Sequence, residues 1–150
     1  MSGLPDPAGF LMHDSWHAEV VLAHRFELAG SADAPARARA DVAALLADRI
    51  SPDDLLDVTV LVSEVVTNAV RHGHRGARDT IVMHVAIAAD VLRIEVCDQG
   101  RGFAPPAHPS RRADGGGNGL ILLQRLTSAW GVATDTGTCV WFERPLQPAG

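Results

Sequence analysis

The chain has 150 residues, of which 47% are hydrophobic and 21% are charged, and this composition fits a single folded domain with its own core. Its formal net charge of −5, without a basic stripe, argues against nucleic acid as a partner. No apolar run approaches the roughly 20 residues that cross a bilayer, and no signal peptide is visible, so we expect no membrane partner.

Two residue types narrow the chemistry further. The chain has only two cysteines, Cys97 and Cys139, so we expect no disulfide framework and a reduced, cytoplasmic setting. All 13 basic residues are arginine, and there is no lysine. A P-loop and the eukaryotic-type kinase fold both need a lysine at the phosphates, so both are excluded. Any bound phosphate must be held by Mg²⁺, arginine side chains and helix N-termini.

The first elements in chain order are a tail, a strand and a helix. Residues 1–14 contain glycine and proline without periodicity, which predicts a loose tail. Alternating apolar residues from Trp16 to Leu28 predict a half-buried strand. Ser31 and Asp33 as N-cap candidates, with Pro35 near the first turn, then predict a helix that runs to about Ile50.

A second helix is predicted from Ser51 to Gly73. Ser51 can cap its start, Pro52 fits the first position, and two aspartates follow at the positive end of the helix dipole. Glycine is the usual residue at a helix stop. Apolar residues at helical spacing form its expected core stripe, which comprises Leu55, Val58, Val62, Val65, Val66 and Ala69.

The remaining sequence predicts four strands, a long loop and a third helix. The loop is rich in proline and glycine and has no apolar period, which is typical of a lid or a disordered segment. Strands in adjacent hairpins, with helices grouped between them, indicate an α+β fold: a two-layer sandwich with helices on one face of a mostly antiparallel sheet. The predicted elements are strands Thr80–Ala88 and Val91–Cys97 around a turn at Ala89-Asp90, the loop Phe103–Asn118, the helix Gly119–Trp130, and strands Val132–Asp135 and Thr138–Glu143.

Glu64 and Asn68 are the first residues with chemical potential. Four residues apart on the second helix, they lie side by side on one face. The Asn68 side-chain oxygen can bind Mg²⁺, which also takes ligands from substrate phosphates. Glu64 can polarise a hydroxyl or a water in line with a γ-phosphate. The same residues also fit the solvated face of any amphipathic helix, so this pair alone does not decide the function.

The segment from Asp98 to Phe103 follows the second strand of the first hairpin. Asp98 shares the alternation of that strand's apolar residues, so its carboxylate should face the helix layer. There it needs a donor, and the exocyclic amine of adenine is one. Gly100 and Gly102 would let the backbone approach a flat ligand closely. An ordinary Asp-x-Gly turn explains the same residues equally well.

Two further features complete the pattern. Glycines in the segment Gly115–Leu120 precede the third helix and would expose its first amides, where phosphate binds. A flexible linker is an equally good explanation of that glycine run. Thr138 shares the alternation of Val140 and Phe142, so its hydroxyl is expected to face the same interior as Asp98. Taken alone, a buried threonine whose hydroxyl bonds to the backbone is the simpler explanation.

The order and spacing of these motifs resemble the GHKL ATPase superfamily (gyrase, Hsp90, histidine kinase, MutL). Within it, the chain is most similar to the compact anti-sigma-factor serine kinases and their actinobacterial relatives. The resemblance covers roughly Trp16 to Pro145, and we expect an ATP-binding domain at 15–145 between tails at 1–14 and 146–150. The most specific stretches are Leu61–Gly73, Asp98–Phe103 and Gly117–Leu123.

The resemblance implies a role for each motif residue. It implies that Glu64 is the catalytic base, that Asn68 binds Mg²⁺, and that Asp98 reads the adenine of ATP. His72 is a candidate nucleotide contact, although a cap of the end of its helix is the more ordinary explanation of this residue. The other implied nucleotide contacts are Gly100, Gly102, Phe103, Gly117, Gly119, Leu120 and Thr138, with Arg111 and Arg112 as candidate contacts to the γ-phosphate.

The resemblance also implies partners. It implies a homodimeric kinase that phosphorylates a serine of an anti-anti-sigma (STAS) protein and binds a sigma factor. However, Leu126–Gly131 lacks the acidic residues expected in such kinases. A catalytically silent module, in which ATP sets the conformation that binds a partner, therefore stays open. A stand-alone histidine-kinase catalytic domain is a minor alternative, because His13-Asp14 is similar to a phosphoacceptor box but no pair of long helices surrounds it.

Overall fold

The computed structural model describes residues 20–73, 80–98, 118–133 and 137–147. The order of its elements is the one predicted from the sequence. The elements are β1 (Val20–Ala29), α1 (Ala34–Leu46), α2 (Pro52–Gly73), β2 (Thr80–Ala88), β3 (Val91–Asp98), α3 (Asn118–Leu126), β4 (Ala129–Ala133) and β5 (Thr138–Pro145).

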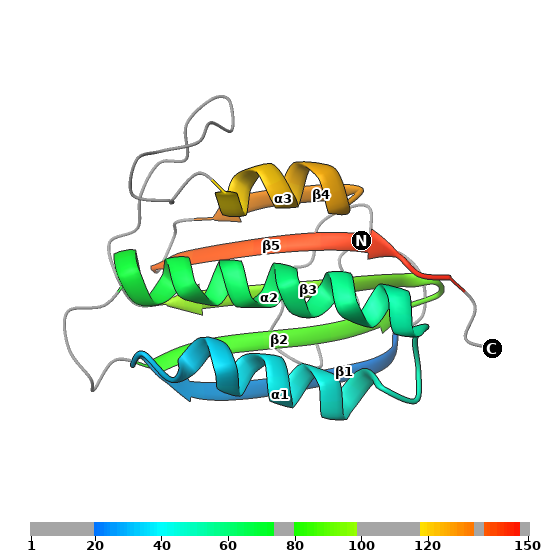
Figure 1. Ribbon diagram of the computed structural model, residues 1–150, viewed down its shortest axis with the longest axis horizontal. Coiled ribbons are helices and arrows are strands. Elements are labelled where there is room, and N and C mark those ends of the chain that lie inside the picture. Colours follow the sequence, from blue (N-terminus) through cyan, green and yellow to red (C-terminus); the bar gives the residue numbers. More distant parts are fainter. Residues whose placement is uncertain (1–19, 74–79, 99–117, 134–136, 148–150) are drawn as a thin grey trace, which may run out of the picture.

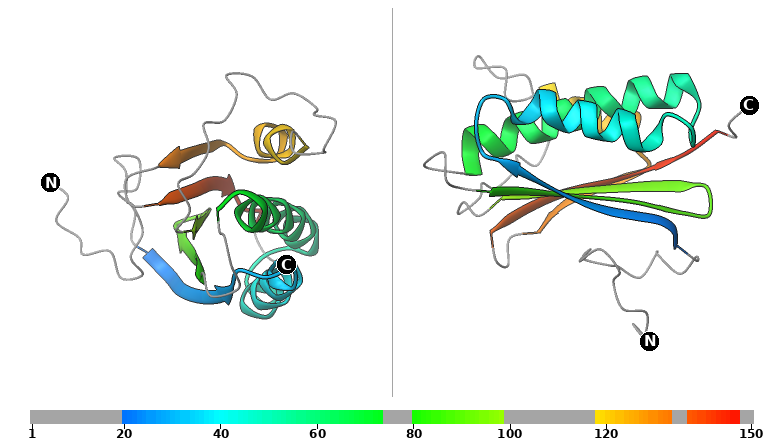
Figure 2. Two further views of the ribbon diagram at one scale, coloured as in Figure 1. Left: turned by 90° about the vertical axis from the view of Figure 1, so that its left-hand side faces the viewer. Right: turned by 90° about the horizontal axis from the view of Figure 1, so that it is seen from below.

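The strands form one five-stranded antiparallel sheet in the order β1-β2-β3-β5-β4. The three helices all lie on one face of this sheet, with α2 between α1 and α3 (Figures 1 and 2). The predicted α+β sandwich is therefore confirmed. In the part of the chain that the structure describes, no helix is both long and apolar enough to span a bilayer.

The core lies between the helices and the sheet. The predicted apolar stripe of α2 faces the sheet: Val58, Val62 and Val66 are fully buried, and Leu55 packs at its edge. Alternate residues of the central strands point toward the helices and complete the core, because successive side chains of a strand lie on opposite faces of the sheet. These strand residues include Ile81, Met83, Leu92, Ile94, Val96 and Phe142.

The start of α2 is fixed by local and distant contacts. Ser51 Oγ accepts a hydrogen bond from the amide of Asp54 (3.1 Å), as expected of an N-cap. The buried Asp54 carboxylate accepts hydrogen bonds from Arg144 Nη2 (3.0 Å) and from the Gln147 amide (2.8 Å). Burial alone would raise the pKa of Asp54, but the bonds from Gln147, Arg144 and Ser51 and the charge of Arg144 together lower it below 3.8. These contacts tie the start of α2 to the end of β5.

Two predicted helices are shorter in the structure. α1 ends at Leu46 rather than near Ile50, because the carbonyl of Leu46 accepts hydrogen bonds from both Arg49 and Ile50 in a closing turn. α3 ends at Leu126 rather than Trp130, which belongs to β4. The amide and hydroxyl of Ser128 both bond to the carbonyl of Glu143 (2.8 and 3.1 Å), so pairing with β5 replaces the last helical turn.

The predicted strands differ less. β4 begins at Ala129, three residues before the predicted start at Val132, for the same reason. In β1 the predicted inward residues Leu22, Phe26 and Leu28 do contact the core. Val20 lies on the other face, because a register shift between Val20 and Leu22 interrupts the alternation. Residues 16–19 of the predicted strand lie outside the described residues.

The expectation of two reduced cysteines is wrong for this structure. Cys97 of β3 and Cys139 of β5 lie directly opposite each other, with their Cα atoms 4.0 Å apart, and their sulfur atoms form a disulfide. The sequence gives no sign of this bond, because the two residues are 42 positions apart and meet only through the pairing of β3 with β5.

Candidate functional site

Two helices and two strands that carry predicted site residues each have one end on the same side of the molecule. α2 and β3 both finish there, and β5 and α3 both begin there (Figure 1, left side). The antiparallel pairing of β3 with β5 fixes this arrangement, because the last residue of β3 stands opposite the first residue of β5. This end of the sheet is the candidate site.

Asp98 and Thr138 form the floor of the candidate site. They are direct partners in the β3–β5 register, and Cβ atoms of such partners lie roughly 4.5–5.5 Å apart. Both follow the alternation of core residues on their strands, so both side chains point into the helix layer. Asp98 is 7% exposed and Thr138 only 1%. The structure therefore brings a carboxylate and a hydroxyl together in a buried position.

The Thr138 hydroxyl indicates which ligand groups could bind beside Asp98. Among the described residues it has no hydrogen-bond partner, although it is fully buried. Leaving a buried hydroxyl without a partner costs about 1–3 kcal/mol. A ligand edge that offers both donors and acceptors would satisfy the hydroxyl and bond to the adjacent carboxylate. The amino and ring nitrogens of adenine form such an edge.

The two flanks of α2 face different neighbours. On one flank, Ser63 Oγ accepts a hydrogen bond from Arg39 of α1 (2.8 Å). On the other flank, Asp57 accepts one from Arg144 of β5 (2.8 Å), and the same guanidinium donates to the carbonyl of Leu126 in α3 (2.8 Å). The Asp57 flank therefore faces β5 and α3.

Glu64 and Asn68 lie on the flank that faces β5 and α3. They follow Asp57 by seven and eleven residues, which places all three in one stripe along the helix. Eleven residues advance the helix by roughly 16 Å, from the Asp57–Arg144 contact toward the end where Asp98 lies. Both side chains are half-buried, so they remain accessible to solvent.

The other predicted contacts are only partly described. Gly119 and Leu120 lie in the first turn of α3, whose amide groups have no helical acceptor, and His72 lies in the last turn of α2. The remaining predicted residues, Gly100, Gly102, Phe103, Arg111, Arg112 and Gly117, lie outside the described residues.

Sequence reasoning missed the polar cluster on the opposite face of the sheet. Arg93 is 1% exposed, and it bonds to Glu143 Oε2 (2.9 Å) and to Glu95 Oε2 (3.3 Å). Its guanidinium lies 4.4 Å from the ring centroid of Trp141. Alternation alone places Arg93 and Glu95 on this face, but only the register with β5 brings Glu143 and Trp141 to them.

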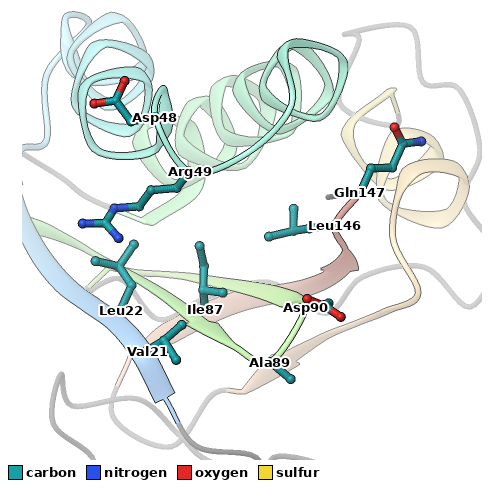
Figure 3. A pocket seen from close by; sticks show the side chains of 9 residues that line it. All are labelled: Val21, Leu22, Asp48, Arg49, Ile87, Ala89, Asp90, Leu146 and Gln147. Carbon is teal, nitrogen blue, oxygen red and sulfur yellow. The ribbon is translucent and has the colours of Figure 1, made fainter. Parts of the chain in front are cut away.

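A cavity of about 370 Å³ opens at the other end of the molecule (Figure 3). It lies between the end of α1, the start of β1, the β2–β3 turn and the segment after β5, and its lining includes Leu22, Arg49, Ile87, Asp90 and Leu146. None of the predicted site residues lines it. This cavity is therefore separate from the candidate site.

Comparison with known families decides the relationship. Residues 29–144 match the model of the histidine kinase-like ATPase domain, which is more than half of the chain. The chain belongs to the histidine kinase-like ATPase family. The resemblance drawn from the motifs is thereby confirmed, and membership of an ATPase family implies that the chain binds ATP.

Curated relatives of this ATPase-family chain carry related names. Serine-protein kinase RsbW of Bacillus licheniformis is 32% identical over 103 residues, which cover 60% of this chain and 64% of that relative. Anti-sigma F factor of Halalkalibacterium halodurans is 36% identical over 121 residues, which cover 73% and 82%. The crystal structure of the RsbU and RsbW domains of a Mycobacterium tuberculosis protein is similar, with a TM-score of 0.65 and 26% identity. The match covers 85% of this chain and 34% of that larger one.

Proposed function

We propose that this ATPase-family chain is an anti-sigma-factor serine kinase of the bacterial cytoplasm. It binds ATP with Mg²⁺, transfers the γ-phosphate to a serine of an anti-anti-sigma (STAS) partner, and binds a sigma factor when that partner is absent. The names of the two curated relatives support this proposal. The observation that carries it is the buried Asp98–Thr138 pair, which lies at the end of the sheet toward which the Glu64–Asn68 stripe leads.

Asp98 and Thr138 recognise the base in this proposal. The Asp98 carboxylate accepts a hydrogen bond from the exocyclic amine of adenine, and the Thr138 hydroxyl bonds to the adjoining edge of the ring. Guanine has a carbonyl where adenine has the amine, so it would set two acceptors against each other. The pair therefore favours adenine over guanine nucleotides.

Asn68 and Glu64 act on the phosphate end of the nucleotide. The Asn68 side-chain oxygen would be the protein ligand of Mg²⁺, which neutralises charge on the phosphates when bound. Glu64, one helical turn earlier, accepts the proton of the substrate serine as its oxygen attacks the γ-phosphorus. The first amides of α3 and the arginines Arg111 and Arg112 supply the positive charge that lysine provides in other kinases.

Glu64 separates the kinase from a silent ATP-dependent module, because only phosphotransfer needs a base. We expect Glu64→Ala to abolish label transfer from γ-labelled ATP to a cognate anti-anti-sigma protein, while ATP affinity stays within several-fold. Asp53→Ala, which removes an exposed carboxylate from the start of the same helix, is the matched control and should transfer label normally.

Two outcomes of that assay would contradict the kinase. Unlabelled partner after incubation with the wild-type protein, despite measurable ATP binding, would identify the silent module. Label on a histidine of the protein itself would identify a histidine-kinase catalytic domain. Light scattering of the same preparation tests the homodimer that the resemblance implies, independently of catalysis.

A further inference from the structure

The disulfide lies directly behind the candidate site. Cys97 precedes Asp98, Cys139 follows Thr138, and the two pairs are consecutive rungs of the β3–β5 ladder. Because successive side chains of a strand point to opposite faces, the disulfide lies on the face away from the helices. One covalent bond therefore joins the backbones that present the proposed adenine-binding pair.

This bond cross-links the end of a strand pair that is already joined elsewhere. Hydrogen bonding continues along the ladder to Val91 and Pro145, and the buried Arg93–Glu143 bond (2.9 Å) links the same two strands toward that far end. The last described rung, Asp98 with Thr138, comes immediately after the disulfide. Strand ends open at a much lower free-energy cost than strand centres. A cross-link at this position acts chiefly on the rung that carries the site.

Both cysteines are only half-buried, so a small reagent can reach them. On the same face Cys97 Sγ lies 3.6 Å from Glu95 Oε1, and Arg93 contacts that carboxylate. The sulfur pair is thus placed beside a charged cluster rather than sealed inside an apolar core. Such exposure is a feature of reactive rather than purely structural cysteines.

We propose that Cys97 and Cys139 are a redox modification site that controls the order of the Asp98–Thr138 rung. This inference rests on the proposed nucleotide site only for its effect on ATP. The oxidant is a small-molecule disulfide, RSSR. One cysteine thiolate attacks it and releases RS⁻, and the second cysteine attacks the mixed disulfide and releases another RS⁻. In total, two protein thiols and RSSR give the protein disulfide and two RSH, with no electron or proton left over.

The oxidised protein binds ATP more tightly. With the cross-link, Asp98 and Thr138 stay in register before the nucleotide arrives, so less ordering is needed on binding. Without it, only the fraction of molecules with a closed rung can bind. If that fraction falls to between about one-tenth and one-third, the apparent affinity falls about three- to tenfold.

The experiment compares the full chain in two redox states. One sample is treated with oxidised glutathione and the other with a phosphine reductant, and intact mass verifies a difference of two hydrogens. ATP affinity is then measured by calorimetry, and amide hydrogen exchange is measured on peptides around Asp98 and Thr138 without nucleotide. Peptides from the middle of β2 serve as the internal control. Cys139→Ser, which cannot form the bond, is measured under both conditions.

The expected result is a three- to tenfold higher affinity and slower exchange at both strand ends in the oxidised wild type. Cys139→Ser should match the reduced protein under both conditions. Equal or higher affinity of the reduced protein, or two free thiols after oxidant treatment, would overturn the proposal. So would stoichiometric Zn²⁺ uptake by the reduced cysteines with Glu95, which would identify a metal site instead. Slower exchange without ATP binding in either state would support control of the rung but contradict the proposed function.

Discussion

Asp98 is a carboxylate at the end of an otherwise apolar inward row, and it is nearly buried. A group in such a position is costly unless it meets donors, so its chemical identity should matter more to a ligand than its size. Asp98→Asn preserves the shape but replaces one acceptor by a donor. We expect ATP affinity to fall about 10- to 100-fold, since a hydrogen bond to a charged group contributes about 1.5–3 kcal/mol.

Calorimetric titration with ATP measures this effect of Asp98→Asn. Asp90→Asn makes the same chemical change at the opposite end of β3, in the exposed β2–β3 turn, and should leave the affinity unchanged. Unaltered ATP binding by the Asp98 variant, with the control also normal, would remove Asp98 from the nucleotide site.

Thr138 allows a test with opposite effects on folding and on binding. Thr138→Val removes a buried hydroxyl that has no hydrogen-bond partner among the described residues, at nearly constant volume. The nucleotide-free protein should therefore keep its stability or gain up to about 1 kcal/mol, whereas ATP affinity should fall about three- to tenfold. Urea unfolding and ATP titration give the two quantities. A clear loss of stability without nucleotide would mean that the hydroxyl serves the fold rather than the ligand.

At the scale of elements, the length of α2 depends on contacts at its start. Asp54 is nearly fully buried, and it joins Ser51 in the cap to Arg144 and Gln147 beyond it. Because its pKa is lowered on folding, its contribution is fully present above the unfolded value and is lost as the pH falls through the lowered folded value. As the pH falls, the contacts between the start of α2 and the end of β5 should therefore weaken before the packing of the core does.

We expect Asp54→Asn to lower the free energy of unfolding at pH 7 by about 1–2 kcal/mol, because it weakens charge-assisted bonds to Arg144. The loss should shrink below pH 4, because the stabilising contribution of the Asp54 charge in the wild type also declines below the unfolded pKa. Urea unfolding between pH 2.5 and pH 7 measures both effects. The neighbouring exposed Asp53→Asn is the control. A stability difference that stays constant across this pH range would show that the charge of Asp54 is not responsible.

The elements also show which features could be predicted from the sequence. α2 was predicted at both ends, because Ser51, Pro52 and Gly73 are local signals and the apolar stripe is long. The ends of α1 and α3 were not, because helical apolar spacing continues past them and the stop is set by other contacts. For α3 that contact is the pairing of Ser128 with Glu143, which only the folded sheet provides.

The candidate site also has features that local spacing predicts and features that only the folded sheet determines. Spacing along one helix sufficed to place Glu64 beside Asn68, and alternation along one strand sufficed to turn Asp98 inward. The position of Thr138 opposite Asp98 depends on the register between strands that are not neighbours in sequence. The disulfide depends on the same register, which explains why it was not predicted.

At the scale of the whole molecule, the sheet has two different faces. One face carries the helices (Figure 2) and the apolar core. The other face carries the buried charges of Arg93, Glu95 and Glu143. Trp141 packs on this charged face opposite Gly131, where a Cβ atom would lie 2.8 Å from the indole ring. The Arg93–Glu143 ion pair joins β3 and β5 on the face of the sheet away from the core.

The charged cluster is expected to be stabilising only as a complete set. Arg93→Met leaves Glu95 and Glu143 buried without the cation between them, so we expect a loss of about 3–5 kcal/mol in the free energy of unfolding. Adding Glu95→Gln and Glu143→Gln removes those charges. The triple variant should therefore be more stable than the single variant, even though it carries two more substitutions. Urea unfolding of the wild type, the single variant and the triple variant tests this. A single variant within 1 kcal/mol of wild type, or a triple variant less stable than the single one, would show that the carboxylates do not depend on Arg93.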